Sequence, residues 1–124
     1  MNAQHQQSLD GAFASATAGL LQEKYDEAFG HLERAHVLGQ VYVGPHVRAH
    51  WLMLRIAVHR REPFAVVGQA IRIVLGALGS AVGVVPIGNT GGTNISMFQR
   101  LPIAPELRDI MEGAAPTPPY RRKA

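Results

Sequence analysis

The chain has 124 residues, 47% of them hydrophobic, which predicts one globular domain with a real core. It contains no cysteine, so disulfides, thiolate metal sites and cysteine nucleophiles are excluded, and any metal must bind histidine, carboxylate or carbonyl groups. Much of the formal net charge of +3 is local to the C-terminal Arg121, Arg122 and Lys123, and no basic stripe with interleaved aromatic residues supports nucleic-acid binding.

The first part of the chain predicts two helices joined by a short polar break. Residues 1–7 are polar, and we expect them to be frayed. A first helix follows, capped by Ser8 or Asp10, because apolar residues recur at helical spacing from there to about Gln22. After the break, a second amphipathic helix extends to Gly39, where a left-handed glycine would end it.

Two more helices are predicted downstream. The third opens at Gly44 and Pro45, since proline suits the first helical turn, and the fourth starts at Pro63 and ends between Gly79 and Gly83. The uncharged stretch at residues 73–87 is shorter than the roughly 20 residues of a membrane helix, so membrane association is not expected. The apolar faces predicted to be buried are Val47, Trp51, Leu52, Leu54, Ile56 and Val58 in the third helix, and Phe64, Val67, Ala70, Ile71, Val74, Leu75 and Leu78 in the fourth.

The last part of the chain is predicted to be an arm of loops. Residues 85–94 are dense in turn formers, a short helix is expected from Pro105 to Glu112, and residues 114–124 are expected to be a disordered, proline-rich basic tail. The predicted fold is therefore all-α, with two antiparallel helical hairpins made of four main helices. A C-terminal loop arm and a short helix complete a single domain at residues 1–113.

Two resemblances accompany this pattern. The stretch KYDEAFGHLERAHVL, with an alanine at 28 and at 35, resembles the second helix of a tetratricopeptide repeat, which implies hairpin geometry but no peptide binding. The motifs HLERAHVLGQ at residues 31–40, HVRAH at 46–50 and PIGNTGGTN at 86–94 resemble those of a bacterial family of unknown function. That resemblance implies a small, mostly helical bacterial protein and no activity.

Residues 31–51 hold four of the six histidines and give the sharpest chemical hypothesis. His46 and His50 are four apart and Glu33 and His36 are three apart, so each pair shares a face of its helix. If the chain folds back between them, the three histidines converge on one divalent metal, with Glu33 as fourth ligand or as the group that orients His36. These ligands favour zinc first, then copper or iron.

Other interpretations of the histidines stay open. They can form a buried polar network without metal, or lie unrelated on the surface. Whether the chain is an enzyme is also open. The sequence has no nucleophile motif, which argues against catalysis, but a metal site with a free position could activate water.

The glycine-rich loop is a second candidate site. Its backbone amides could bind an anion, or its polar side chains could cap their own turns. In either case the loop could lie over the histidines and close them off. The candidate ligand-binding residues are Asn89, Thr90, Gly91, Gly92 and Asn94.

The predicted function is that of a small cytoplasmic bacterial protein that binds a divalent metal. The alternative is a helical adaptor that binds a protein partner, with histidines that serve only the structure. Two hairpins alone would leave apolar surface exposed, so either the tail or a second subunit must cover it, and a homo-oligomer is possible. The small residues Gly79 and Gly83 are spaced as in closely packed helix pairs.

Overall fold

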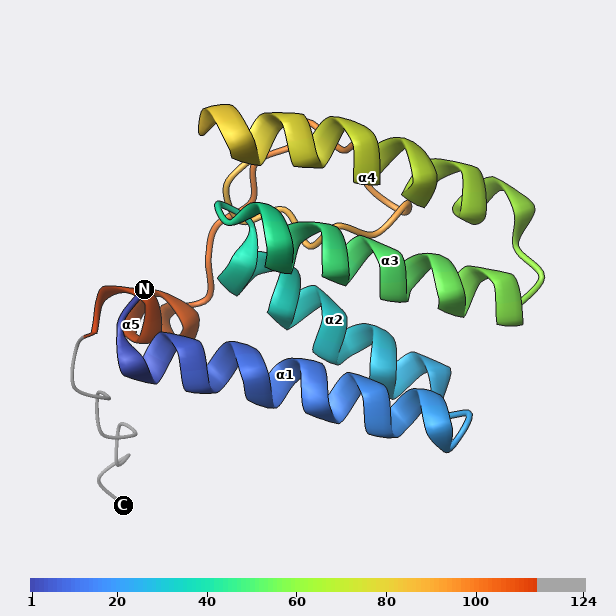
Figure 1. Ribbon diagram of the computed structural model, residues 1–124, viewed down its shortest axis with the longest axis horizontal. Coiled ribbons are helices and arrows are strands. Elements are labelled where there is room, and N and C mark those ends of the chain that lie inside the picture. The colour runs from blue at the N-terminus through green and yellow to red at the C-terminus, as the bar shows by residue number, and fades with distance from the viewer. Residues whose placement is uncertain (114–124) are drawn as a thin grey trace, which may run out of the picture.

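The computed structural model describes residues 1–113, and over these residues the protein is all-helical, as predicted (Figure 1). α1 packs against α2 and α3 against α4 as two hairpins, α2 also packs on α3, and α5 lies against α1 (Figure 1). The prediction of a disordered tail at residues 114–124 lies outside the described residues. The helices are α1 (Ala3–Leu21), α2 (Tyr25–Gly39), α3 (Val43–His59), α4 (Pro63–Val82) and α5 (Pro105–Glu112).

The start of the chain is ordered, and the expectation of fraying at residues 1–7 is wrong. The side chain of Asn2 caps α1 by accepting a hydrogen bond from the amide of His5 at 2.7 Å, and it donates to the carbonyl of Ile110 in α5 at 3.1 Å. His5 is itself buried, and its Nε2 lies 2.6 Å from the carbonyl oxygen of Leu38. These contacts tie the first helical turn to α2 and α5, so α1 begins well before Ser8.

Gly39 ends α2 as predicted, but for a different reason. It is helical, and the residues with left-handed glycine geometry lie elsewhere. A Cβ atom at Gly39 would lie 2.6 Å from the Cβ of Pro45, so only glycine lets α3 begin this close to the end of α2. The two helices that carry the histidines are thereby brought together at this end.

The main hydrophobic core joins α1, α2, α3 and α5, and it receives no buried residue from α4. In α3 the buried face carries Leu52, Met53 and Ile56, whereas Trp51 and Val58 are 53% and 54% exposed. The buried face of α3 is therefore rotated by part of a turn from the predicted one. Leu52 and Ile56, which widened the predicted stripe, are the members that belong to the core.

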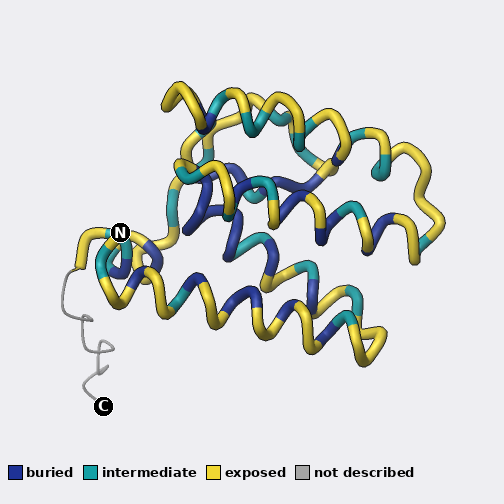
Figure 2. Tube along the Cα trace, viewed as in Figure 1, coloured by how far each residue is buried: buried dark blue, intermediate teal, exposed yellow. Residues whose placement is uncertain are grey.

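The orientation of α4 is opposite to the prediction. Its buried residues are Gln69 and Ser80, while the predicted apolar stripe faces outward, with Phe64 92% exposed and Leu78 62% exposed (Figure 2). Within the described residues, α4 is also the one helix long and apolar enough to cross a membrane, yet only 11% of that window is buried in the protein. The polar face of α4 is turned inward because it serves the histidines.

Candidate metal centre

The structure brings His36, His46 and His50 together in one buried cluster. His36 comes from the last turn of α2, and the other two lie one turn apart on α3, so the fold-back between the helices supplies the convergence that their spacing predicted. All three side chains are at most 3% exposed. One ring nitrogen of each lies within 4.8 Å of those of the other two.

Each imidazole is held through its Nδ1 by a different partner. His36 Nδ1 lies 2.6 Å from the carbonyl oxygen of Asn89, in the loop, and His50 Nδ1 lies 2.7 Å from Oε1 of Gln69, on α4. His46 Nδ1 is hydrogen-bonded to the hydroxyl of Ser80, also on α4. The three rings are thus fixed by three separate contacts that surround the cluster.

These partners decide where the protons are. The Asn89 carbonyl can only accept, so His36 Nδ1 carries a hydrogen. The amide nitrogen of Gln69 donates to the carbonyl of Gly91 at 3.1 Å, which leaves Oε1 to accept from His50. Ser80 donates to the carbonyl of Gln40 at 2.8 Å, so its oxygen accepts from His46. Every Nδ1 is therefore a donor, and every Nε2 of the neutral rings bears a free lone pair.

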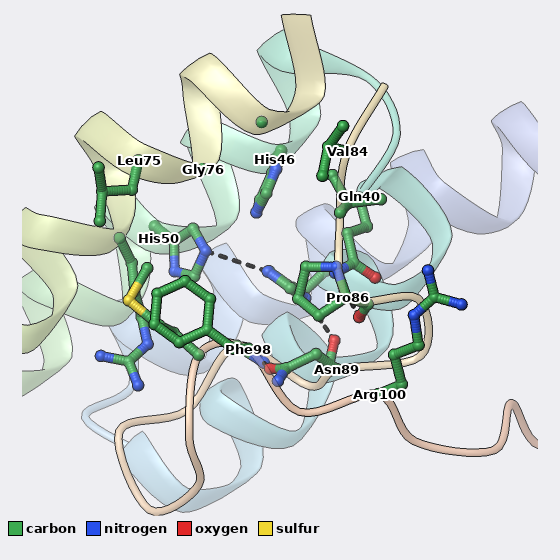
Figure 3. A pocket seen from close by; sticks show the side chains of 16 residues that line it. Gln40, His46, His50, Leu75, Gly76, Val84, Pro86, Asn89, Phe98 and Arg100 are labelled. Carbon is green, nitrogen blue, oxygen red and sulfur yellow. Dashed lines mark hydrogen bonds between the residues drawn. The ribbon is translucent and has the colours of Figure 1, made fainter. Parts of the chain in front are cut away.

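Two of these lone pairs face each other. The Nε2 atoms of His36 and His50 are 3.0 Å apart, and with both Nδ1 atoms protonated neither Nε2 has a hydrogen to give (Figure 3). Protonation does not relieve the contact easily, because burial lowers the pKa of His50 to about 4 and that of His36 well below its usual value, with the neighbouring histidines adding to the effect on His36. Burial also lowers the pKa of His46. A cation bound between the rings would interact favourably with all three lone pairs and would remove the repulsion between them.

Glycines allow the surrounding chain to approach the rings. Gly91 has a φ of +84°, and a Cβ there would lie 2.7 Å from Cδ2 of His36. A Cβ at Gly76 of α4 would lie 3.0 Å from Nε2 of His46. The glycine-rich loop therefore lies against His36, and α4 lies against His46.

Most of the loop serves structure. The side-chain amide of Asn89 donates to the carbonyls of Ser96 and Gln99, and its oxygen accepts from the amide of Gly91, so its polar atoms are used within the arm. Asn94 is exposed and lines a different cavity. Of the predicted ligand-binding residues, Asn89 and Gly91 border the histidine cavity, while Thr90 and Gly92 do not line it.

Glu33 lies apart from the three imidazoles. It does not belong to the group of converging ligand atoms in the described residues, and it lines the second cavity, together with Asn94 and Gln69. Burial raises the pKa of its carboxyl group, against a smaller lowering by a hydrogen bond with Thr90. The observed contact of Glu33 is thus with the loop that covers His36.

A cavity of about 280 Å³ opens on the histidines (Figure 3). Its wall combines Gln40 and the three rings with one face of α4 and with the segment that follows α4. Residues that line it away from the histidines include Arg72, Leu75, Val85, Pro86, Phe98 and Arg100.

Sequence reasoning missed the partners that orient the rings. In the sequence, Gln69 interrupts the apolar stripe of α4, and Ser80 lies between Gly79 and Gly83. That interruption was the available signal, because a lone amide in a strongly apolar helix needs a polar partner when it is buried. Gly79, one of the two small residues spaced as in a packed helix pair, instead packs against its own chain. A Cβ at Gly79 would lie 2.5 Å from the carbonyl oxygen of Val84.

The chain belongs to a family described as "Protein of unknown function (DUF3703)", whose family model matches residues 3–111. This match confirms the predicted resemblance to a family of unknown function. No curated protein and no solved structure matches the chain. The tetratricopeptide-like geometry and the bacterial origin therefore stay predictions, and the function rests on the site itself.

Proposed function

We propose that this member of the family binds a divalent metal ion through His36, His46 and His50, with zinc as the first choice. The observation that carries the proposal is the set of three Nδ1 hydrogen bonds, which leaves each Nε2 lone pair free on three buried rings whose nitrogens lie close together. Histidine ligands of metals typically donate their other ring N–H to an oxygen in this way.

The spacing of the nitrogens supports the same proposal. Three atoms no more than 4.8 Å apart lie within about 2.8 Å of a common point. Zinc–nitrogen bonds are about 2.0–2.1 Å long, so small movements of the rings would complete three bonds. Three protein ligands with a cavity beside them are typical of a zinc site whose fourth position is open.

The ligand chemistry ranks the metals. Zinc accepts three neutral nitrogens in tetrahedral geometry, whereas non-haem iron commonly uses two histidines and a carboxylate, and Glu33 lines another cavity. Copper(II) favours a tetragonal arrangement, so it ranks behind zinc. Glu33 is proposed to support the loop over His36 and not to ligate the ion. The lack of cysteine is in keeping with the predicted cytoplasmic location.

The test is metal analysis of protein purified without an affinity tag, followed by titration of metal-free protein with Zn²⁺. We expect close to one ion per chain in the parent and its loss in a His46→Ala/His50→Ala variant. His31→Ala is the matched control, because His31 is exposed and outside the cluster. Circular dichroism establishes that each variant is folded.

Either of two results would sink the proposal. One is a folded parent that neither carries metal nor gains thermal stability with added Zn²⁺, Cu²⁺, Fe²⁺, Mn²⁺ or Ni²⁺, because a ligand of the native state must stabilise it. The other is a folded double variant that binds Zn²⁺ as tightly as the parent. The histidines would then be polar core groups.

One observation favours a second function, binding of a protein partner through α4. Every exposed residue of this helix is apolar, and contiguous apolar surface of this kind marks interaction sites. We propose a second copy of the chain as its occupant. Residues 64, 67, 71, 74 and 78 follow alternating steps of three and four, the spacing of a helix–helix seam.

A further inference from the structure

The cavity beside the histidines has an unusual balance of charge. Two arginines, Arg72 and Arg100, line it, and no aspartate or glutamate of the described part of the chain lies in its wall. Each imidazole donates through its Nδ1 to a neutral oxygen, so the three ligands bring no negative charge to the site. A divalent ion held by them would therefore keep its full charge of two, with further positive charge close by.

Arg72 is built into the wall. Its guanidinium donates to the carbonyls of Gly68 and Ile95 at 3.1 and 3.0 Å, and its Nε is buried without a hydrogen-bond partner among the described residues. Arg72 lines the same cavity as His36 and His50. The cation is thus fixed near the site and not neutralised by a carboxylate in the cavity wall.

A cation with only neutral ligands attracts an anion strongly when the surroundings are of low polarity. Leu75, Val85 and Phe98 make part of the wall apolar, and α4 contributes Gly76 beside His46. Arg100 is exposed at the same cavity and makes no ion pair with any described residue (Figure 3). The wall therefore offers positive charge to a head group and apolar surface to a short tail.

We propose that the fourth position of the metal takes the carboxylate of a small organic acid with a short apolar tail. This inference rests on the proposed metal centre and deepens it by giving the ligand class. With a metal held by the three histidines, the carboxylate oxygen would occupy its open position, Arg100 would attract the approaching anion, and the tail would pack on Leu75 and Phe98. The volume of about 280 Å³ limits the ligand to a small acid.

The experiment uses the full chain loaded with Co²⁺, whose visible absorption reports both metal binding and a change in the fourth ligand. Acetate, hexanoate and azide are titrated separately into the loaded protein. We expect hexanoate to change the spectrum and to bind about tenfold more tightly than acetate, since its longer chain buries additional methylene groups. Phe98→Ala should reduce this preference for hexanoate.

Arg100→Gln tests the charge on the wall. It should weaken hexanoate binding about threefold, the effect of a partly exposed ion pair, and leave Co²⁺ binding unchanged. Arg55→Gln removes the same charge from an exposed position of α3 outside the cavity, and it should leave hexanoate binding unchanged.

The outcomes separate the two proposals. If Co²⁺ and Zn²⁺ do not bind, the metal centre itself is wrong. If Co²⁺ binds but none of the acids changes its spectrum, the metal centre stands and this inference is wrong. If azide binds and acetate and hexanoate do not, the site takes small inorganic anions and the assignment to organic acids is overturned. Equal affinities for hexanoate and acetate would also overturn the role of the apolar wall.

Discussion

At the scale of single residues, the side-chain amide of Gln69 fixes which ring nitrogen of His50 carries the hydrogen. Its nitrogen donates to the Gly91 carbonyl, so its oxygen must face His50 Nδ1. Turning the amide over would let Nε2 of His50 carry a hydrogen toward His36, but it would set the Gln69 oxygen against the Gly91 oxygen. A metal-free network of neutral rings therefore leaves two acceptors in contact somewhere, which is costly when buried.

Replacement of Gln69 by leucine should weaken metal binding without removing a ligand. His50 would lose the acceptor that fixes its ring and its tautomer, and the loss of such a partner typically costs 10- to 100-fold in metal affinity. Competition of the protein with a coloured zinc chelator measures this change. Gln99→Leu is the control, because the side chain of Gln99 is exposed. An unchanged zinc affinity in a folded Gln69→Leu protein would contradict the proposed role.

The buried histidines also predict how the stability of the metal-free protein depends on pH. Unfolded histidine has a pKa near 6.5, while burial lowers the pKa of His50 to about 4. Between these values the unfolded chain binds more protons than the folded one, so the free energy of unfolding falls as the pH falls. From pH 7.5 to pH 5, His50 alone should account for about 2 kcal/mol of that loss.

Urea unfolding of metal-free protein at a series of pH values measures this dependence. The loss should be larger than the value for His50 alone, because the pKa values of His36 and His46 are lowered too. His31→Ala should keep the profile of the parent. A folded parent whose stability is the same at pH 7.5 and pH 5 would show that the native cluster takes up protons as readily as the unfolded chain, and would contradict the free Nε2 lone pairs.

At the scale of elements, the loop over the cluster requires a glycine at position 91. Alanine there would need a left-handed backbone and would place its Cβ against the ring of His36. We expect Gly91→Ala to lower the free energy of unfolding by about 1–3 kcal/mol, and to weaken zinc binding because His36 must move.

Denaturant unfolding compares this variant with Gly30→Ala. Gly30 lies within α2, and a Cβ there would meet nothing within 4 Å, so its replacement should keep or raise stability by up to about 1 kcal/mol. Equal stability of the parent and Gly91→Ala would mean that the loop does not hold this conformation.

The elements also show what the sequence could predict. The helices and the last short helix follow from local signals, such as the proline that begins α4 and the helical spacing of apolar residues. The convergence of His36 with His46 and His50 follows from their spacing and the short fold-back. The face of α4 does not, because an apolar stripe predicts burial and cannot reveal that Gln69 and Ser80 are needed inside. The ordered start of α1 depends on Ile110 in α5, far along the chain, and no local pattern contains that contact.

At the scale of the whole molecule, α4 links the site to the outer surface, because its polar face points inward and its apolar face points outward. The face with Gln69 and Ser80 holds His50 and His46, and the opposite face is fully apolar. Leu75 contributes to both the histidine cavity and the exposed apolar surface of α4, because it lines the cavity and is 44% exposed. A partner on α4 would therefore lie next to the proposed ligand site.

We expect the protein to form a dimer through α4, since burying this strip removes apolar surface from water in both copies. Replacing Val74 and Leu78 by glutamate should abolish the dimer, because both side chains lie in the helix–helix seam and are 60% and 62% exposed. Sedimentation velocity measures the mass of the parent and of the Val74→Glu/Leu78→Glu variant. Metal binding should survive, because neither residue lines the histidine cavity.

The matched control adds the same two charges to another helix. Ala14 and Ala18 are exposed on α1, one turn apart, so Ala14→Glu/Ala18→Glu should keep the mass of the parent. A parent that sediments as a monomer at all concentrations, or a α4 variant that stays dimeric, would exclude this face as the interface between copies. Dimerisation through α4 together with metal binding would mean that one helix orients two ligands with its polar face and recruits a second subunit with its apolar face.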